Sequence, residues 1–374
     1  MTKEKQIHSN QDSLNLTEED IRWGTPEAVA NYRAKRLSCN TIVDLCCASG
    51  FQSFAFAKTC KKVIAIDLDP QKIARAKENA KTLNIKNIEF HVGDVLEPHI
   101  IKLAIGADII FCDPERLESE PKRTIDTIIP NIKELLEEYQ KITQNIAIEL
   151  PPLLEQDEIN TLRPNFKNLK PQSFEKEYIT YQGRTNRLTL YFGSLQHTTT
   201  KVVALPSTEE LSPNNKKLAT TNPPQATNQN TVPSQPTLTQ QNSKTTLEVE
   251  TFLCEIDPTL ERANLLSEFQ QKVGGTIIAQ KKNIYLHAIS PIYSPFITNI
   301  YRILNISEFK IGEIVKALKL LDAKQVTLRF HVSPQKYWNE RSRLEKQLSG
   351  EKSLQLFKIG TQAIITEKIE NIKQ

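Results

Sequence analysis

TIVDLCCASGF (41–51) is the stretch of sequence that decides the fold. A run of β-branched and apolar residues ends in small residues, and a helical pattern follows them. This order is typical of the first strand, turn and helix of a doubly wound α/β sheet, in which helices separate parallel strands. Three later runs repeat it: VIAID (63–67), IEFHV (88–92) and ADIIFC (107–112). We therefore expect an α/β domain with a parallel sheet.

Further elements are expected on both sides of these four strands. NIAIEL (145–150) predicts a fifth strand, and EKEYITY (175–181) and RLTLYFG (187–193) predict a terminal antiparallel hairpin that closes the sheet. Thr25-Pro26 is a typical helix start, with Thr25 as the N-cap and Pro26 in the first helical position. The remaining helices are expected at about 51–59, 70–83 and 126–142.

Composition divides the 374 residues into zones. Residues 1–22 are expected to form an N-terminal extension, and residues 23–200 the α/β domain. Residues 204–246 are rich in Pro, Thr, Asn, Gln and Ser. They hold too little apolar surface to offset their ordering entropy, so we expect a disordered linker. Apolar patterning returns in residues 247–374, which we expect to form a smaller α+β domain.

The composition also limits the partners of the chain. With 39% hydrophobic and 25% charged residues, it has the composition of a soluble globular protein. No run approaches the roughly 18 apolar residues of a membrane span, and the start lacks the apolar core of a signal peptide. We therefore expect a cytoplasmic protein with no membrane partner. None of the six cysteines lies in a Cys-x-x-Cys pair and no His has a matching spacing, so no metal is expected. The net charge of +4 permits a nucleic-acid partner without requiring one.

The turn after the first strand is a candidate cofactor loop. A nucleotide-type cofactor must approach the backbone closely where this strand meets its helix, so the loop needs small residues. The usual pattern is Asp-x-Gly-x-Gly-x-Gly. Asp44 and Gly50 keep their places, whereas Cys46 and Ala48 replace the first two glycines. A cofactor could still approach the backbone of this loop closely, although cysteine and alanine allow fewer backbone conformations than glycine. Taken alone, the feature could instead be a tight turn that binds no ligand.

Acidic residues follow the next three strands. Asp67 is placed to bind ribose hydroxyls, Asp94 to accept from an adenine amino group, and Asp113 to lie beside a reacting methyl group. Each acid alone could instead cap the next helix. Four acids at successive strand ends favour an S-adenosylmethionine site, and NAD is the alternative cofactor. The expected cofactor-binding residues are Asp44, Ala48, Ser49, Gly50, Asp67, Leu68, Asp94 and Val95.

FCDPER (111–116) supplies the candidate catalytic residues, Asp113, Pro114, Glu115 and Arg116. Methyl transfer from a sulfonium depends mainly on a well-placed nucleophile. Asp113 could orient or deprotonate an amine, and Arg116 could hold a phosphate. The alternative for Glu115 and Arg116 is a surface ion pair.

The candidate substrate-binding residues combine charges from two places in the chain. Cations alternate with aromatic residues near the end of the second domain, as suits phosphates and unpaired bases of structured RNA. An amphipathic helix with a solvated charged face, and with Tyr337 and Trp338 in the core, is the alternative. The candidate residues are Glu27, Arg33, Arg329, Lys336, Arg341 and Arg343.

With these motifs in view, the chain resembles the class I S-adenosylmethionine-dependent methyltransferases that end in a THUMP-like domain. The resemblance lies in TPEAVANYRAKR (25–36), DLCCASG (44–50), DLDP (67–70), DPER (113–116) and EIDPTLERANLL (255–266), and the closing domain resembles the family from Ile311 to Ile365. It implies a Rossmann-like methyltransferase sheet and S-adenosylmethionine as cofactor.

The first half also resembles the RNA cap guanine-N2 methyltransferases, through WGTPE (23–27) and VIAIDLDPQKIARAKENA (63–80). It departs from amino-group methylases in having no stacking aromatic residue after Pro114, and this departure bears on the identity of the base. The expected function is methylation of RNA, such as tRNA or another structured RNA. The alternatives are a non-catalytic RNA-binding protein on a decayed methyltransferase fold, and a methyltransferase for a protein or small molecule.

Overall fold

The strands that the sequence predicts around Asp44 form one parallel sheet in the computed structural model. The structure describes residues 7–116, 124–162, 174–213, 247–279 and 283–369. The chain divides into two units, residues 1–213 and residues 214–374, and each is described by itself. The predicted parallel strands are confirmed as β1 (Thr41–Leu45), β2 (Lys62–Asp67), β3 (Ile88–Val92), β4 (Ile109–Cys112) and β7 (Ile146–Leu150).

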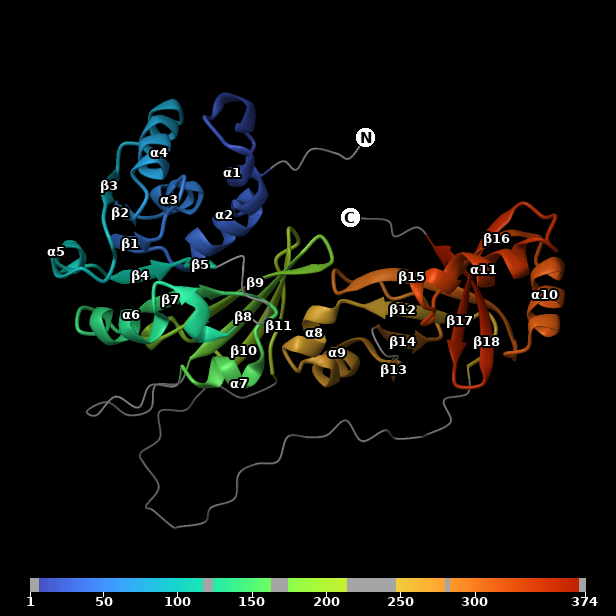
Figure 1. Ribbon diagram of the computed structural model, residues 1–374. Helices are drawn as coiled ribbons and strands as arrows, with labels where there is room; N and C mark the ends of the chain where they lie inside the picture. The colour runs from blue at the N-terminus through green and yellow to red at the C-terminus, as the bar shows by residue number, and fades with distance from the viewer. Residues whose placement is uncertain (1–6, 117–123, 163–173, 214–246, 280–282, 370–374) are drawn as a thin grey trace, which may run out of the picture. The chain divides into compact units, whose positions relative to one another are not determined.

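The predicted hairpin is also confirmed. β8 (Glu175–Tyr181) and β9 (Arg184–Tyr191) are antiparallel, and β9 pairs with β7. The sheet then continues beyond the predicted domain end. β10 (Thr200–Leu205) runs parallel to β8, and β11 (Glu209–Leu211) is antiparallel to β10. Within the described residues, the strand order is β11-β10-β8-β9-β7-β4-β1-β2-β3 (Figure 1).

The two predicted boundaries of this domain therefore need correction. The sheet includes residues 200–211, so the boundary at residue 200 is too early, and residues 204–213 belong to the first unit rather than to a linker. Residues 214–246 of the expected linker lie outside the described residues. The expected N-terminal extension contains α1 (Glu18–Trp23) and a short 3-10 helix, η1 (Gln11–Ser13), and both belong to the first unit.

Helices pack on the sheet largely where the sequence places them. α2 (Glu27–Arg36) and α3 (Phe51–Ala57) cover one face through a buried apolar cluster that includes Ala34, Phe56 and Phe111. In α2 the N-cap is Pro26 rather than Thr25, a shift of one residue that is common at helix ends. The remaining helices are α4 (Pro70–Thr82), α5 (Pro98–Ile101), α6 (Ile132–Tyr139) and α7 (Gln156–Asn160), with the 3-10 turns η2 (Lys102–Ala104), η3 (Ile125–Thr127) and η4 (Gly193–Leu195).

α6 is shorter than the predicted helix at 126–142. Pro130 has no N–H to donate, and the Asn131 side chain caps the helix by accepting from the backbone N–H groups of Lys133 and Glu134. The segment before it forms β6 (Ile128–Ile129) instead. This strand pairs with β5 (Glu115–Arg116) in a small antiparallel ribbon directly after β4.

The second unit combines helices with a mixed sheet, and this agrees with the predicted combination of helices and strands. Within the described residues its strand order is β13-β14-β12-β15-β18-β17-β16. β16 and β17 are parallel, and the other neighbours are antiparallel. The strands are β12 (Phe252–Ile256), β13 (Thr276–Ala279), β14 (Ile284–Ala288), β15 (Ile297–Glu308), β16 (Ala323–Leu328), β17 (Lys352–Ile359) and β18 (Gln362–Ile369). The helices are α8 (Pro258–Arg262), α9 (Leu266–Val273), α10 (Ile311–Leu320) and α11 (Pro334–Glu345).

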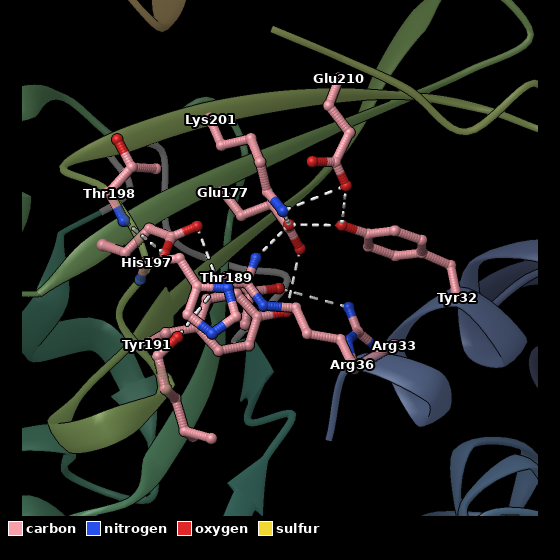
Figure 2. Close-up of polar contacts among 12 residues, drawn as sticks. Tyr32, Arg33, Arg36, Glu177, Thr189, Tyr191, His197, Thr198, Lys201 and Glu210 are labelled. Atoms are coloured by element: carbon pink, nitrogen blue, oxygen red, sulfur yellow. Dashed lines mark hydrogen bonds and ion pairs between the residues drawn. The ribbon is translucent and has the colours of Figure 1, made fainter. Parts of the chain in front are cut away.

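A buried network of charges joins α2 to the hairpin side of the first sheet (Figure 2). The Arg36 guanidinium pairs with Glu177 and, at 2.8 Å, with Glu175. Glu177 also pairs with Lys201 at 3.1 Å, and it accepts hydrogen bonds from the hydroxyls of Tyr32 and Tyr191. Glu175 and Glu177 are fully buried. Each buried acid of the network therefore has a cation or several donors.

Candidate active site

The turn after β1 has the backbone of a glycine-rich loop, although two of its glycines are replaced. Cys46 and Ala48 have φ values of 63° and 47°, in the left-handed region that favours glycine. Holding a residue with a side chain there costs about 1 kcal/mol. At Gly50, where φ is 87°, a Cβ would come within 2.8 Å of the Phe54 ring. The loop thus keeps its shape despite the replacements, and Gly50 is required by its surroundings.

Asp67 holds this loop in place. Its Oδ2 accepts from the backbone N–H of Ala48 at 2.7 Å, and its Oδ1 accepts from the N–H of Asp69 at 3.0 Å. Burial raises the pKa of Asp67, and these two hydrogen bonds counter the rise in part. A carboxylate oxygen accepts more than one hydrogen bond, so the same group can still receive a hydroxyl.

Asp44 is the most deeply buried acid of this edge, with an exposed fraction of 1%. The Ser53 hydroxyl donates to Oδ2, whereas Oδ1 has no hydrogen-bond partner. Burial raises the pKa of Asp44 to about 7; the Ser53 hydrogen bond lowers it, and the charge of Asp113 raises it further. An unpaired carboxylate oxygen in a buried place is costly, so it marks a position for a donor or a cation.

Asp113 lies beside Asp44 at the end of β4. Its N–H donates to the Leu45 carbonyl at 3.3 Å, which ties the ends of β4 and β1 together. Asp113 is half-buried and Pro114 is buried. Glu115 and Arg116 form β5, and Arg116 is described only in its backbone. The Glu115 carboxylate pairs with Lys72 of α4 and is exposed, so for Glu115 the alternative of a surface ion pair is consistent with the structure.

The remaining cofactor candidates after β2 and β3 lie at the same edge. The N–H of Gly93 donates to the Asp67 carbonyl at 3.0 Å, which brings Asp94 next to the β2 end. Asp94 is exposed and accepts from the N–H of Leu96 at 2.9 Å. Val95 is buried, whereas Leu68 is 68% exposed. The structure thus brings all four predicted acids to one edge of the sheet.

Ser49 has a partner that sequence patterns did not indicate. Its hydroxyl donates to Oδ1 of Asp20 in α1. Asp20 also accepts from the Thr17 hydroxyl at 2.8 Å and forms an ion pair with Arg75 of α4 at 3.2 Å. The Ser49 side chain is therefore directed to the N-terminal segment, and only its backbone is available to a cofactor.

The contacts of Arg33 correct its prediction, whereas Glu27 stays a predicted substrate-binding residue. The Glu27 carboxylate accepts from the N–H of Ser9 at 2.8 Å and pairs with Lys58 at 3.7 Å, so it fixes the N-terminal segment. Arg33 has no exposed surface, pairs with Glu149, and donates to Oε1 of Gln52 at 2.8 Å. Because this guanidinium is enclosed, it cannot contact a substrate. Arg33 therefore has a structural role. It lies beneath the edge of the sheet that carries Asp44, Asp67, Asp94 and Asp113, which we call the acidic edge.

In the second unit, three of the predicted cations lie on α11, whereas Arg329 lies on the other face of the sheet. The Arg329 guanidinium lies over the Tyr301 ring at 5.5 Å. Lys336 is exposed, Arg341 pairs with Glu345 at 2.8 Å, and Arg343 with Glu340 at 3.6 Å. The two aromatic residues of α11 differ. Tyr337 packs against the apolar core, as the amphipathic-helix alternative predicts, whereas Trp338 is 66% exposed, contrary to it.

Within the described residues, no group of three or more His, Cys, Asp or Glu side chains has an arrangement that could hold a metal ion. Nor does any helix of this part of the chain have the length and apolar character needed to cross a membrane.

The site lies in a stretch that matches a known domain family. Residues 38–178 match the family model of a methyltransferase domain. An uncharacterized RNA methyltransferase of Clostridium tetani is 33% identical over 115 residues, which are 28% of this chain and 25% of that protein. An uncharacterized S-adenosylmethionine-dependent methyltransferase of Mycobacterium tuberculosis is 24% identical over 182 residues, which are 48% of this chain and 46% of that protein. The chain thus spans about a quarter to a half of the length of these relatives.

Among solved structures, the chain is similar to a methyltransferase candidate from Porphyromonas gingivalis W83. The TM-score is 0.64 at 16% sequence identity, and the match covers 96% of this chain and 83% of that one. The two proteins therefore share a fold along nearly the whole chain.

Proposed function

We propose that the chain is an S-adenosylmethionine-dependent methyltransferase that acts on RNA. The observation that carries the proposal is the buried Asp44 carboxylate, whose Oδ1 has no partner beside a turn with a glycine-type backbone. The match of residues 38–178 to a methyltransferase domain supports the class of enzyme. The Clostridium tetani relative, described as an RNA methyltransferase, supports the class of substrate.

The residues of the acidic edge fit a cationic adenosyl cofactor. S-adenosylmethionine, when bound, supplies a methyl group on a positively charged sulfur, and it also carries an ammonium group. Asp44 Oδ1 lacks a donor, and an ammonium group would supply one. Asp67 would accept from ribose hydroxyls and Asp94 from the adenine amino group. NAD, the alternative, has no ammonium group to satisfy Asp44.

The other candidate cofactor-binding residues would contact the cofactor through their backbone or through apolar surface. Ala48, Ser49 and Gly50 would offer backbone at close approach, since the Ser49 side chain is engaged by Asp20. Leu68 and Val95 would contact the adenine with apolar surface. For Leu68 this would cover a side chain that is 68% exposed without a ligand.

Asp113 would position the acceptor. Methyl transfer to an amine leaves an extra proton on its nitrogen, and a carboxylate held at that point can accept the proton. The tie between the Asp113 N–H and Leu45 fixes this carboxylate relative to the loop. Pro114 would shape the turn, Lys72 would keep Glu115 aside, and Arg116 would bind a phosphate.

The second unit would dock the RNA. We assign it a THUMP-like role, with Lys336, Arg341 and Arg343 contacting phosphates from α11. Arg329 would act separately, because it lies over the Tyr301 ring on the other face of the sheet. The resemblance of the first half to cap guanine-N2 methyltransferases makes an exocyclic amine of a base the acceptor to test first. Such an enzyme would work in the cytoplasm, where its RNA substrates are found.

Incubation of the full chain with labelled S-adenosylmethionine and total cellular RNA tests the proposal. Label should appear in RNA, and Asp113→Ala should abolish it while S-adenosylmethionine binding stays within a few-fold of the wild type. Asp126→Ala is the matched control, because Asp126 is a surface acid paired with Lys133 at 2.9 Å. Unlabelled RNA under conditions where the cofactor binds would overturn the RNA assignment.

The non-catalytic alternative rests on Cys46 and Ala48, which replace the expected glycines. It predicts no heat when the protein is titrated with S-adenosylmethionine in a calorimeter. A protein or small-molecule methyltransferase is distinguished differently. Its activity would be unchanged by joint replacement of Lys336, Arg341 and Arg343 with alanine, whereas an RNA methyltransferase would lose substrate affinity.

A further inference from the structure

The chain has only two tryptophans, and they share an unusual setting. Trp23 is 51% exposed and Trp338 is 66% exposed, although tryptophan is among the most buried residues on average. An arginine lies over each ring, Arg22 at 4.6 Å and Arg341 at 5.5 Å. Exposed aromatic rings with adjacent cations are what proteins use to stack on unpaired nucleic-acid bases. Trp338 lies on α11 with Lys336, Arg341 and Arg343, whereas Trp23 lies on the other unit.

α1, which ends at Trp23, is fixed beside the candidate cofactor loop. Thr17 caps the helix by accepting from the N–H of Asp20 at 3.2 Å. On the side facing the sheet, Asp20 accepts from Ser49 of the loop and pairs with Arg75 of α4. A helix of only six residues is held here by tertiary contacts rather than by its own propensity.

The end of this helix lies at the loop end of α3. A Cβ added at Gly24 would come within 2.5 Å of the Asp20 carbonyl, 2.9 Å of Ile7 and 3.3 Å of Phe51. Phe51 is the first residue of α3 and directly follows Gly50 of the loop. The end of α1 therefore lies near the start of α3, and Trp23, adjacent to Gly24, is 51% exposed.

The motif that contains Asp113, where we place the acceptor, has no aromatic side chain after Pro114. Pro114 is followed by Glu115 and Arg116, and among the Phe, Tyr and Trp side chains of residues 7–116, 124–162 and 174–213, which the structure describes, Trp23 is the exposed one. Asp20, in the first turn of α1, is paired with Arg75.

We propose that Trp23, with Arg22 over one face of its ring, is a stacking platform for an unpaired base of the RNA substrate at the edge of the active site. The inference rests on the proposed function and extends it, since it adds a base-binding residue that the motifs do not supply. The second unit would then hold phosphates while Trp23 holds a base near the reacting edge.

Because there are two tryptophans, each can be observed alone. In Trp338→Phe, Trp23 is the only source of tryptophan fluorescence, and a single-stranded adenine oligoribonucleotide should quench it in a saturable manner. The same oligonucleotide paired with its complement should quench much less, because paired bases are not available for stacking. No quenching of Trp23 at concentrations where the protein binds the oligonucleotide would overturn the proposal, as would equal quenching by the duplex.

Kinetics supply the second measurement. Trp23→Ala should raise the KM for RNA on the order of 10-fold, as loss of one stacked base predicts, with S-adenosylmethionine affinity unchanged. Trp23→Phe, which keeps a ring, should recover most of the loss, whereas a role in packing alone would also move cofactor affinity through α1. An unchanged KM in Trp23→Ala, in an enzyme that does methylate RNA, overturns the inference alone. Quenching without RNA methylation by the wild type would support it and overturn the proposed function instead.

Discussion

Two sets of buried acids in the first unit differ in whether they have ion-pair partners. Beneath α2, Glu149 and Glu177 each have cations within ion-pair distance. At the carboxyl edge of the sheet, Asp44 and Asp67 are buried to a similar degree, yet neither has an ion-pair partner within the described residues. Burial alone would raise the pKa of Glu177, but Arg36 and Lys201 hold it below its usual range. The pKa of Asp44, by contrast, is raised to about 7.

The difference separates a structural function from a binding function. A buried acid that only joins elements gains stability from a cation in the same chain. A buried acid left without one costs stability, and such a cost is retained where a ligand offsets it. Asp44 thus has the setting of a group that awaits a cationic partner. The network beneath α2 fixes the helix, and the acidic edge is where we propose that the chemistry takes place.

Glu177→Gln should produce the largest change in stability. It leaves Arg36 with Glu175 and Lys201 with the partly exposed Glu210 as their remaining acids, which should lower the free energy of unfolding by about 3–5 kcal/mol. Thermal denaturation at pH 8 measures this. Glu210→Gln is the matched control, because Glu210 contacts the same Lys201 at 3.2 Å but is 47% exposed, so a change of less than about 1 kcal/mol is expected. Equal effects of the two variants would contradict the contrast between the regions.

Asp44→Asn should raise the stability of the cofactor-free protein, in contrast to Glu177→Gln, and should weaken the binding of S-adenosylmethionine. The folded-state pKa is above the unfolded value, so the cofactor-free protein loses stability as pH rises from about 4 to 7. The uncharged amide avoids this loss, and Tm at pH 8 should rise by about 2 °C or more. S-adenosylmethionine affinity should fall on the order of 100-fold, as calorimetry would show.

The control for that variant is Asp108→Asn. Asp108 accepts from the N–H groups of Asn40 and Thr41 at 3.0 and 2.8 Å, at the amino end of β1 and away from the loop. It should leave cofactor affinity unchanged. A lower Tm for Asp44→Asn with unchanged affinity would make Asp44 a structural residue like Glu177.

Ala48→Gly should have the smallest effect. The φ value of 47° suits glycine, so the change relieves about 1 kcal/mol of backbone strain but increases the entropy of the unfolded chain by a similar amount. Tm should change by less than about 2 °C, and cofactor affinity by less than about threefold. A large loss of affinity would show that the Ala48 methyl group itself contacts the cofactor.

Much of the fold follows from local sequence patterns. β1 to β4, β7 and the β8–β9 hairpin are confirmed, because apolar runs bounded by turns are sufficient evidence for buried strands. The acids at the carboxyl edge share a place for the same reason, since parallel strands end together. The sequence pattern did not indicate that β10 and β11 extend the sheet, because these strands lead directly into the polar zone that follows.

What the sequence could not reveal depends on distant partners. Arg33 is buried by its pairing with Glu149, 116 positions away, whereas arginine in an amphipathic helix is usually exposed. Asp20 is in a polar segment, and only its contact with Ser49 shows that the segment belongs to the site. The Thr17-x-x-Asp20 spacing does indicate a capped helix, but it says nothing of what that helix contacts.

Proton release on cofactor binding tests the central claim most directly. Below pH 7 the Asp44 carboxyl is largely protonated in the free protein, so binding of an ammonium group to its carboxylate must release a proton. Calorimetry of S-adenosylmethionine binding between pH 5.5 and 7, in buffers of different ionisation enthalpy, should show about one proton released at the lowest pH. Affinity should rise by up to about tenfold per pH unit, and Asp44→Asn should abolish both effects. Binding of equal affinity across this range, with no proton released by the wild type, would contradict the assignment of Asp44 as the cation-binding group.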